Sequence, residues 1–521
     1  MLLHQMIDDA AARHPQNLAA RCGSDDLTYE ALLRQRNGLA RLLRDTGLQR
    51  RARVAVFLGR GVRVPISYYG VLAAGGVLVP IDPKSPVEQV IRILNATRAT
   101  HLVTEEPKKR LVQHALPYCP DVTQVLGLEQ GDEDPPCATA SWTNVENEAG
   151  DEAPNVPIIG MDPCYVLHTS GSTGIPKLIQ HTHDTAMSFV DWAAQEYALT
   201  ADDRLSNHSS HHTCFATFDY YAAARVGAAT IILTPGELML PASLATTIER
   251  EKISVWYSVP TALVQLSLRG DLEERDLSSL RWILFAGETF PEKHLRRTMQ
   301  QLPGARFSHV YGSTEVNVCT YYHLPEEGDF SSPLPIGQAC SNANTLVVDD
   351  DLQEVAPGEA GELLIRGGTV MSGYWGEPER NERVLVRRPA GGQLNEIYFR
   401  TGDRVHELPD GNLKFIARAD LQIKIRGHRV ELEEVETALL SLDPVEEAAA
   451  FAIPDGEGSS ALRAAVVCAE GTQVQDLRAG LREKLPSHAI PAEISILAAL
   501  PRTPTNKVDR RALKAQLEEN A

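Results

Sequence analysis

One stretch of the sequence combines the residue types that bind a polyphosphate. Residues 165–177, YVLHTSGSTGIPK, begin as an apolar strand and end in a loop rich in glycine and hydroxyl side chains. Glycine lets a backbone approach phosphate closely, hydroxyl and backbone N–H groups donate to its oxygens, and lysine adds positive charge. The loop is not a Walker A motif, because G-x-x-x-x-G-K-[ST] is absent. The candidate phosphate ligands are Thr169, Ser170, Gly171, Ser172, Thr173, Gly174 and Lys177.

The elements that must position this loop alternate between apolar strands and helical patterns. Candidate strands lie at residues 54–58, 76–81, 230–233 and 282–285. Such alternation is typical of parallel sheets covered by helices. After about residue 344, short strands separated by turn signals such as Pro409-Asp410-Gly411 predict a small β-barrel or meander. The last hundred residues return to an α+β pattern, with a helix near residues 431–442 and a strand near 464–468.

The composition narrows the classes of partner. The 521 residues suffice for two to four domains. A formal net charge of −19 argues against general binding to nucleic acid or to an anionic membrane, because both reward a basic surface. No uncharged apolar run reaches the roughly 18 residues of a membrane span. The eight cysteines form no CxxC pair and no secretory signal is visible, so a cytoplasmic location with reduced thiols is expected.

Residues 129–157 form an acidic, proline-containing stretch without clear periodicity. They contain eight acidic residues and four prolines. This composition predicts an exposed, mobile surface loop. A docking tail for a basic partner is the functional alternative.

Nine motifs in register extend over nearly the whole chain. By these motifs the chain resembles the adenylate-forming superfamily and, within it, the stand-alone amino-acid adenylation domains of nonribosomal peptide synthesis, with features of the prolyl-adenylating type. The motifs are LTYEALL (27–33), VLAAGGVLVPIDP (71–83), TSGSTGIPK (169–177), YGSTE (311–315), GELLIRG (361–367), FRTGD (399–403), ARADLQIKIRGHRVELEEVE (417–436), LPSHAIP (485–491) and TNKVDRR (505–511).

The resemblance implies a fold and a reaction. The implied fold is α/β, with a large N-terminal lobe of two layered α/β subdomains plus a small β-barrel, and then a small, mobile α+β C-terminal domain. The implied division falls between residues 1–419 and 420–521. The implied enzyme is an ATP-dependent ligase that needs ATP and Mg²⁺. It would convert a small carboxylic acid to an acyl-adenylate and pass the acyl group to the phosphopantetheine thiol of a separate carrier protein.

The resemblance also assigns roles at the nucleotide. Tyr311 would stack on the adenine ring, and Thr314 would bind a phosphate. Glu315 would hold Mg²⁺, a hard cation that suits a carboxylate ligand. Asp403 would accept hydrogen bonds from the ribose hydroxyls, and Arg418 would assist there.

Lys507 is the implied catalytic residue. Charge builds up as the substrate carboxylate attacks the α-phosphate, and a lysine placed there stabilises that charge. The family usually has glycine before this lysine, whereas this chain has Asn506, which tolerates positive φ. Asp420 is the implied hinge between the domains. Rotation there would swing out Lys507 and bring in the face that receives the phosphopantetheine arm. That face carries Lys424, Arg426 and Gly427.

The acid pocket is expected between the fourth and fifth motifs. Counting back from Gly227 places Cys214 where amino-acid adenylation domains carry an aspartate that pairs with the substrate ammonium. Asp219 occupies that role in an alternative register. The other expected lining residues are Phe215, Phe218, Tyr257, Leu284, Ala286, Val310, Val318 and Cys319.

This pocket leaves two substrate classes open. The side chains at 284, 286, 318 and 319 resemble those of prolyl-adenylating enzymes and favour a small, compact, largely apolar acid. A buried ammonium without a counter-charge is costly. Either Asp219 or a histidine arrangement therefore compensates for the missing aspartate, or the substrate is a hydroxy, keto or heteroaromatic acid without an α-ammonium.

Three further readings compete with this assignment. An acyl- or aryl-CoA ligase would use free CoA, but residues 421–436 look more like peptide-synthesis domains. A non-catalytic binding scaffold is disfavoured by the intact candidate residues in the motifs. A zinc site at His208, His211, His212 and Cys214 has no usual ligand spacing, so these residues are expected to line or flank the acid pocket.

Overall fold

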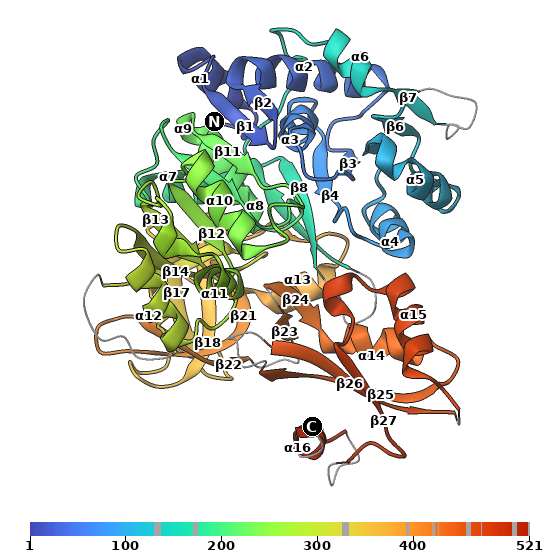
Figure 1. Ribbon diagram of the computed structural model, residues 1–521, viewed down its shortest axis with the longest axis vertical. Coiled ribbons are helices and arrows are strands. Elements are labelled where there is room, and N and C mark those ends of the chain that lie inside the picture. The colour runs from blue at the N-terminus through green and yellow to red at the C-terminus, as the bar shows by residue number, and fades with distance from the viewer. Residues whose placement is uncertain are drawn as a thin grey trace.

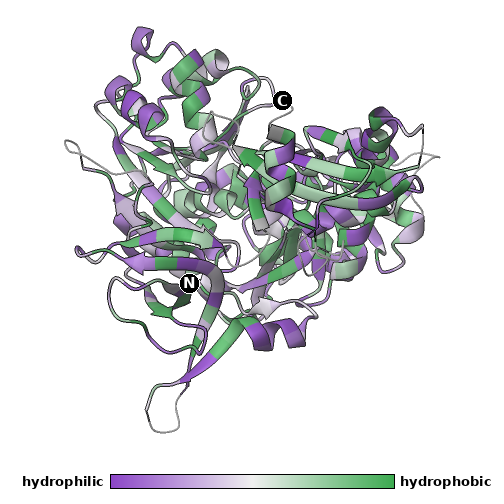
Figure 2. Cartoon of the chain, turned by 90° about the horizontal axis from the view of Figure 1, so that it is seen from below, coloured by the Kyte–Doolittle hydropathy of each residue, from purple (hydrophilic) through white to green (hydrophobic). Residues whose placement is uncertain are grey.

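The computed structural model consists of a large lobe built on two extended sheets and a small lobe beside it (Figure 1). The structure describes residues 1–129, 137–169, 176–325, 333–391, 395–418, 422–425, 427–454, 460–469, 471–502 and 508–518. Residues up to 418 are called the large lobe, and those from 422 the small lobe. Hydrophobic residues are concentrated along the strands inside both lobes, and hydrophilic residues mark the outer helices (Figure 2).

The first sheet carries the strand that leads into the phosphate loop. Its order is β19-β9-β8-β4-β3-β5-β6-β7, and β3 to β8 run parallel, whereas β9 and β19 are antiparallel additions. The strands are β3 (Arg53–Val56), β4 (Val77–Pro80), β5 (His101–Val103), β6 (Gln124–Leu126), β7 (Ala138–Ala140), β8 (Pro163–Thr169), β9 (Lys177–Thr182) and β19 (Gly373–Tyr374). The helices that follow β3, β4 and β5 are α3 (Arg63–Ala73), α4 (Val87–Thr97) and α5 (Lys109–Ala115).

The second sheet has nine strands in the order β16-β15-β14-β13-β12-β10-β11-β1-β2. Six neighbouring strands, from β14 to β1, are parallel. The strands are β1 (Leu18–Cys22), β2 (Asp25–Thr28), β10 (Arg204–Asn207), β11 (Ala229–Ile232), β12 (Val255–Ser258), β13 (Trp282–Phe285), β14 (Arg306–Ser313), β15 (Asn317–His323) and β16 (Gln338–Ala339). Their helices include α7 (His183–Glu196), α8 (Phe215–Thr217), η3 (Phe218–Ala222), α9 (Ala223–Val226), α10 (Pro241–Glu251), α11 (Pro260–Arg269) and α12 (Glu292–Gln301).

One hydrophobic core joins these two sheets. It contains Val54 and Leu78 of the first sheet and Leu205 and Val255 of the second, all fully or almost fully buried. Side chains of α1 (Gln5–Arg13), α2 (Tyr29–Asp45), α3 and α7 complete it. Because burial of apolar area is favourable and interiors are closely packed, this shared core fixes the two sheets relative to each other.

The predicted β-barrel or meander is an antiparallel sheet. It packs against β9 of the first sheet and β15 of the second. It has the order β17-β18-β21-β20, with β22 paired to β21. The predicted turn at Pro409-Asp410-Gly411 joins its last two strands, and the Gly411 N–H donates to the Leu408 carbonyl at 2.9 Å. The strands are β17 (Ala343–Val348), β18 (Gly361–Gly367), β20 (Leu385–Pro389), β21 (Asn395–Glu407) and β22 (Leu413–Arg418), with α13 (Pro378–Val384) before β20.

The small lobe has the predicted α+β composition. A three-stranded sheet packs against two helices, and a two-stranded hairpin precedes it. Its elements are β23 (Gln422–Ile425), β24 (His428–Glu431), α14 (Leu432–Leu440), β25 (Val445–Pro454), β26 (Ser460–Cys468), α15 (Val474–Lys484), β27 (Glu493–Ile496) and α16 (Arg510–Glu518). The interdomain boundary predicted at 420 lies outside the described residues and stays a prediction.

The prediction of a mobile loop across residues 129–157 is wrong for its central part. Residues 142–147 form α6 (Trp142–Asn147), which begins with a capping box between Ser141 and Asn144. Trp142 is buried, and its indole N–H donates to the Thr104 carbonyl at 2.8 Å. The acidic composition concealed this short helix, because a single buried aromatic residue and a cap suffice to hold it. Residues 130–136 lie outside the described part.

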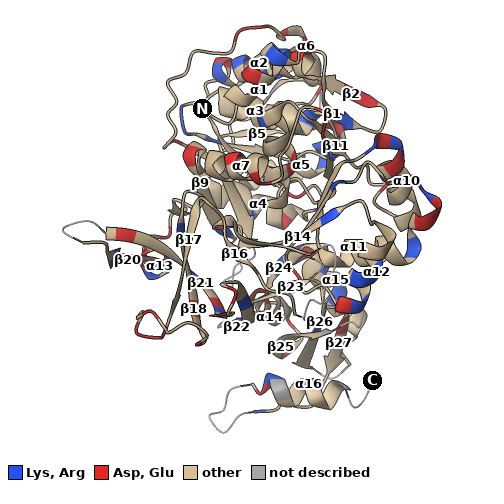
Figure 3. Ribbon diagram, turned by 90° about the vertical axis from the view of Figure 1, so that its left-hand side faces the viewer, with Lys and Arg blue, Asp and Glu red and all other residues tan. Residues whose placement is uncertain are grey.

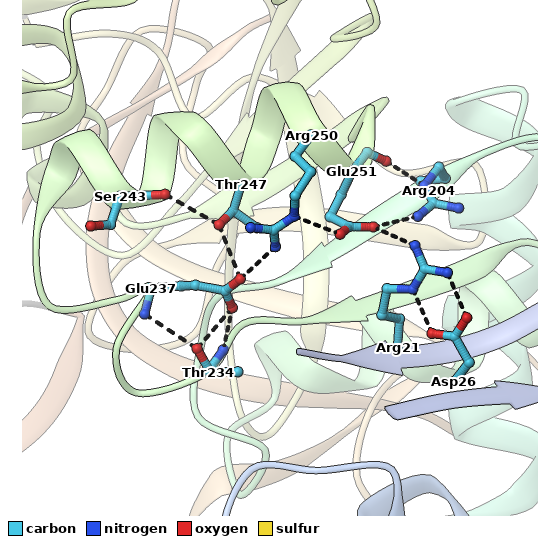
Figure 4. Close-up of polar contacts among 9 residues, drawn as sticks. All are labelled: Arg21, Asp26, Arg204, Thr234, Glu237, Ser243, Thr247, Arg250 and Glu251. Carbon is cyan, nitrogen blue, oxygen red and sulfur yellow. Dashed lines mark hydrogen bonds and ion pairs between the residues drawn. The ribbon is translucent and has the colours of Figure 1, made fainter. Parts of the chain in front are cut away.

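A polar network ties the N-terminal hairpin to the second sheet (Figure 4). Glu251, at the end of α10 and only 5% exposed, accepts from Arg21 of β1 at 3.0 Å and from Arg204 of β10 at 2.7 Å. Arg250 contacts its other oxygen at 3.0 Å. Burial alone would raise the pKa of this carboxyl, but hydrogen bonds from Arg250 and Arg21 outweigh it and lower the pKa. Both signs of charge are otherwise interspersed over the surface (Figure 3).

Within the described residues, every helix is too short or too polar to cross a bilayer.

Glu251→Gln should lower the free energy of unfolding of the large lobe by about 2 kcal/mol at neutral pH. Loss of a buried partner leaves arginines unpaired, but their partial exposure limits the cost. The lowered pKa means that this contribution exists above the ordinary pKa of glutamate and disappears on acidification. Urea unfolding followed by tryptophan fluorescence measures it. Asp26→Asn, which breaks an exposed pair, is the control and should cost under about 1 kcal/mol; equal losses in both variants would contradict the network's importance.

Candidate active site

Two adjoining cavities lie where the large and small lobes meet. The first, of about 340 Å³, is lined by residues that follow β13, by β14 and β22, and by Lys424 of the small-lobe hairpin. The second, of about 100 Å³, extends from Thr169 and Cys214 to Gly427. Glu288 of the first cavity accepts a hydrogen bond from the Gly427 N–H of the second at 2.9 Å. The ends of parallel strands thus converge on one interlobe site, as open α/β sheets generally arrange ligand sites.

Three predicted nucleotide residues meet on the wall of the first cavity. Arg418 Nη1 lies 2.5 Å from Asp403 Oδ1, and the Tyr311 hydroxyl donates to Asp403 Oδ2. Asp403 is almost buried, so this pairing holds its carboxylate in one orientation beside the cavity. A fixed, charged acceptor next to an aromatic ring is suited to vicinal hydroxyls attached to a flat heterocycle.

The predicted phosphate and metal residues lie at or next to the second cavity. Thr169 and Thr314 both line the second cavity, and the buried Thr169 hydroxyl has no hydrogen-bond partner among the described residues. Glu315 Oε1 accepts from Tyr374 at 2.8 Å and from Arg429 at 2.7 Å, whereas its buried Oε2 accepts no hydrogen bond from any described residue. Burial would raise the pKa of Glu315, but chiefly the Arg429 charge lowers it to about 2. Residues 170–174 lie outside the described part.

These residues fit a magnesium ion. A carboxylate with an unused oxygen offers the single protein ligand that Mg²⁺ usually takes when phosphates and water complete its shell. The described residues contain no group of three or more His, Cys, Asp or Glu side chains that could hold a metal ion by themselves.

The small-lobe hairpin reaches the site at Gly427. This residue has φ +79°, and a Cβ there would lie 2.2 Å from Val259 Cγ1. Glu288, which binds the Gly427 N–H, is itself fixed by the Thr261 hydroxyl at 2.6 Å. The predicted face with Lys424 and Gly427 is therefore against the large lobe. Arg426 lies outside the described residues.

The predicted catalytic residue Lys507 lies outside the described residues, and so does the predicted hinge Asp420. Arg502 and Val508, which lie on either side of Lys507 in the sequence, form an isolated β-bridge. Val508 packs with Phe451 and Leu513 on the face of the small-lobe sheet that carries α16. Figure 1 shows α16 on the far side of this sheet from the large lobe. The hairpin, rather than this end of the small lobe, meets the first cavity in this arrangement.

Most of the expected acid-pocket residues gather in one apolar cluster. Phe215 packs on Tyr257 with ring centroids 4.6 Å apart, and Phe218 meets the same ring at 5.5 Å. Leu284, Ala286, Val310 and Val318 belong to the same buried core, with Cys214 packed against it. Cys319 does not join them. Adjacent residues of a strand face opposite sides of the sheet. Cys319 therefore faces away from Val318 and packs with Ile336 and Leu363 on the other side.

Asp219 does not supply a charge to this pocket. Its side chain is fully buried on η3, its Oδ2 accepts from Asn207 Nδ2 at 2.9 Å, and it lines neither cavity. Burial, opposed by Asn207 and Arg60, raises its pKa well above the usual range. In this arrangement Asp219 faces Asn207 rather than either cavity, and its assignment as the partner of a substrate ammonium stays a prediction.

Four histidines that sequence reasoning did not associate line the second cavity. His168 stacks on His212 at 5.7 Å in the large lobe, and His428 stacks on His488 at 4.0 Å in the small lobe. Burial lowers the pKa of His168 to about 4, and also lowers that of His428. They come from four segments that are separate in the sequence, so only the fold brings them together. His208 instead packs on Trp256.

Glu434 is a buried carboxyl in the same cavity that titrates near neutrality. Burial, reinforced by Glu431 and opposed by Arg92, raises its pKa to about 7. A raised carboxyl pKa means that stability is full below the ordinary pKa and is lost as pH rises toward 7. Glu434→Gln should therefore stabilise the protein at pH 8, on the order of 3 kcal/mol, and change little at pH 4.

Thermal and urea unfolding at both pH values measure this effect. Glu433→Gln, an exposed neighbour on α14, is the matched control and should show no pH-dependent gain. A gain from Glu434→Gln that is the same at pH 4 and pH 8 would show that ionisation is not its cause.

Comparison with known proteins agrees with this geometry. Residues 7–375 match the AMP-binding enzyme family and residues 434–507 match the AMP-binding enzyme C-terminal domain. An L-proline–[L-prolyl-carrier protein] ligase of Pseudomonas fluorescens is 35% identical over 99% of both chains, and one of Streptomyces coelicolor is 34% identical over 97% of this chain and 94% of that protein.

Solved structures share the fold. An amide bond synthetase from Marinactinospora thermotolerans has a TM-score of 0.85 at 24% identity, covering 99% of each chain. An artificially fused adenylation–PCP di-domain from Klebsiella oxytoca has a TM-score of 0.80 at 22% identity, covering 95% of this chain and 93% of that one. With both lobes matched by their models and full-length relatives above 30% identity, the chain belongs to the family of AMP-binding enzymes.

Proposed function

We propose that this protein is an ATP-dependent ligase that adenylates a small carboxylic acid and transfers the acyl group to the phosphopantetheine thiol of a separate carrier protein. The observation that carries the proposal is the junction of the two cavities. The Tyr311–Asp403–Arg418 group lies in one, the thiol-side residue Gly427 lies in the other, and Glu288 links them. Two relatives of nearly the same length are named as proline ligases of a carrier protein.

The first half-reaction joins the acid to AMP. A carboxylate oxygen attacks the α-phosphorus of ATP, and the bond to the pyrophosphate oxygen breaks. Asp403 orients the ribose, Tyr311 covers the adenine, and Lys177 neutralises the departing phosphates. Glu315 would hold Mg²⁺, which supplies further neutralisation of phosphate charge. Lys507 would reach the reacting centre after rotation of the small lobe.

The second half-reaction uses the arrangement seen here. The thiol sulfur attacks the acyl carbon, the carbon–oxygen bond to AMP breaks, and the thiol proton is released. The missing side chain at Gly427 lets the hairpin backbone lie against Val259 at the edge of the second cavity, and the narrow arm is proposed to enter along this cavity. A side chain at this position would occupy the space of Val259 or of the arm.

The acid is proposed to be about the size of proline. The relatives named as proline ligases and the small residues Ala286 and Val318 support a compact acid. The neutral wall at Cys214, together with the inward-turned Asp219, favours a variant of this class that carries no α-ammonium, such as a five-membered heteroaromatic acid.

A pyrophosphate-exchange assay tests the activity and separates these acids. We expect exchange of labelled pyrophosphate into ATP with L-proline or with pyrrole-2-carboxylate, and at most weak exchange with phenylalanine or long-chain acids. Higher kcat/KM for the pyrrole acid would assign the ammonium-free class. Cys214→Asp should then shift the preference toward proline by about tenfold, because a buried carboxylate stabilises an ammonium. No exchange with amino, hydroxy, keto or aryl acids would refute the proposal.

Gly427→Ala tests the second half-reaction separately. We expect thioester formation to fall by at least about tenfold while pyrophosphate exchange is retained, because the added methyl group clashes only in the hairpin-docked arrangement. Gly471→Ala is the matched control, since this small-lobe glycine also has positive φ but has open space around it. Equal effects of both substitutions would point to backbone strain instead. Thioester formation on free CoA and not on a carrier would assign the CoA-ligase alternative.

A further inference from the structure

Four charged side chains alternate in sign across the lobe interface. Lys177 Nζ lies 2.5 Å from Glu431 Oε1, Arg429 Nη2 lies 3.5 Å from the same oxygen, and Arg429 Nη1 lies 2.7 Å from Glu315 Oε1. Lys177 and Glu315 belong to the large lobe, whereas Arg429 and Glu431 belong to β24 of the small lobe. All four side chains are at least four-fifths buried.

The geometry of β24 explains how one short strand presents both charges. Alternate residues of a strand point to the same face, so Arg429 and Glu431 share one face. Val430, between them, is fully buried in the core of the small lobe. The hairpin therefore presents a cation and an anion, two residues apart, to the large lobe.

The contacts are strong because they are withdrawn from water. Buried charges are costly unless they are paired, and removing one partner of such a pair is strongly unfavourable. Burial and the neighbouring Arg429 charge lower the pKa of Lys177, with Glu431 opposing this shift. Docking of the hairpin therefore requires that Lys177 and Glu315 are not paired with other charged groups.

The same two charges have another use in the proposed reaction. Lys177 would bind the phosphates that leave as pyrophosphate, and Glu315 would hold Mg²⁺. A phosphate beside Lys177 would also lie beside the Glu431 carboxylate, and a cation beside Glu315 would lie beside the Arg429 guanidinium. Like charges at such distances in a buried site repel strongly. In the docked arrangement, Glu431 takes the place of the anion and Arg429 takes the place of the cation.

We propose that Arg429 and Glu431 are positioning residues that make hairpin docking and retention of magnesium pyrophosphate mutually exclusive. The inference rests on the proposed function and adds to it the side chains that replace the departing product. Once pyrophosphate and its metal have left, Glu431 occupies Lys177 and Arg429 occupies Glu315. Because coupling is reciprocal, magnesium pyrophosphate displaces the hairpin to the same extent that the hairpin displaces magnesium pyrophosphate. The docked hairpin also prevents pyrophosphate from reversing adenylation while the thiol reacts.

Variants Arg429→Gln and Glu431→Gln test the kinetic consequence. Thioester formation is followed in a single turnover, from preformed adenylate to pantetheine, with and without added magnesium pyrophosphate. Each variant should form thioester about tenfold more slowly and should be half-inhibited at an about tenfold lower pyrophosphate concentration. Pyrophosphate exchange should be retained or faster, which also shows that the variants are folded. Arg429→Lys should recover part of the lost rate.

Arg463→Gln is the matched control for charge. Arg463 lies on β26, pairs with Glu493 at 3.2 Å within the small lobe and lines neither cavity. This variant should match the unaltered protein in exchange, thioester formation and pyrophosphate sensitivity. A similar loss in this control would mean that general weakening of the small lobe causes the effects.

Hydrogen–deuterium exchange provides a readout that needs no turnover. Magnesium pyrophosphate should raise deuterium uptake at residues 422–431 of the unaltered protein, whereas uptake in Arg429→Gln should be high without it. Unchanged uptake in the unaltered protein, or wild-type pyrophosphate sensitivity in both Gln variants, would overturn the inference. Absence of exchange with every acid would instead refute the proposed ligase activity, while the uptake measurement would still decide the exclusion.

Discussion

The site depends on one topological constraint, the common edge at which the parallel strands end. Strands β12, β13 and β14 are neighbours and run in the same direction. Val259, Glu288 and Tyr311, which are distant in sequence, therefore come to the same edge of the sheet. The shared core with the first sheet brings Thr169 to the same place. Hydrogen bonds and ion pairs at the site refine positions that strand order and apolar packing have already set.

The interface between the lobes is more specific than the lobes themselves. Each lobe has its own hydrophobic core. What joins them at the site is a few polar contacts, including Gly427 with Glu288 and Lys177 with Glu431. Polar contacts of this kind are directional and reversible. They suit an interface that, in the proposed reaction, forms and separates as the small lobe rotates.

Sequence motifs were sufficient to find three residues on the wall of the first cavity, but not every residue of the site. Tyr311, Asp403 and Arg418 lie within short patterns whose order along the chain identifies them, and the fold brings them together. Asp219 shows the limit of spacing arguments. A shift of one residue along the π-helix η3 changes the direction in which a side chain points. The sequence also does not reveal that Asn207 donates a hydrogen bond to the Asp219 carboxyl.

The same limit applies to Cys319 and to the stacked histidines. Which face of a strand meets a pocket depends on where the bulge in the β14–β15 pairing falls, and this is a property of both strands. The four histidines belong to four separate segments of the sequence and to two lobes, so no local pattern relates them. The helix at Trp142 was missed for a simpler reason. It is held by a capping box and by buried side chains, including an aromatic residue bound to a distant carbonyl, rather than by a long periodic pattern.

The N-terminal hairpin, anchored through Arg21 to Glu251, has a consequence for self-association. Strand β1 covers the side of β11, whose residues are all buried, and β2 becomes the outermost strand of the nine-stranded sheet. The outermost strand begins with Asp25 and Asp26, both exposed. Charges on a terminal strand discourage the addition of a strand from another molecule. The first thirty residues thus protect β11. Without them, this apolar strand would have one unpaired edge, at which a strand of another molecule could add.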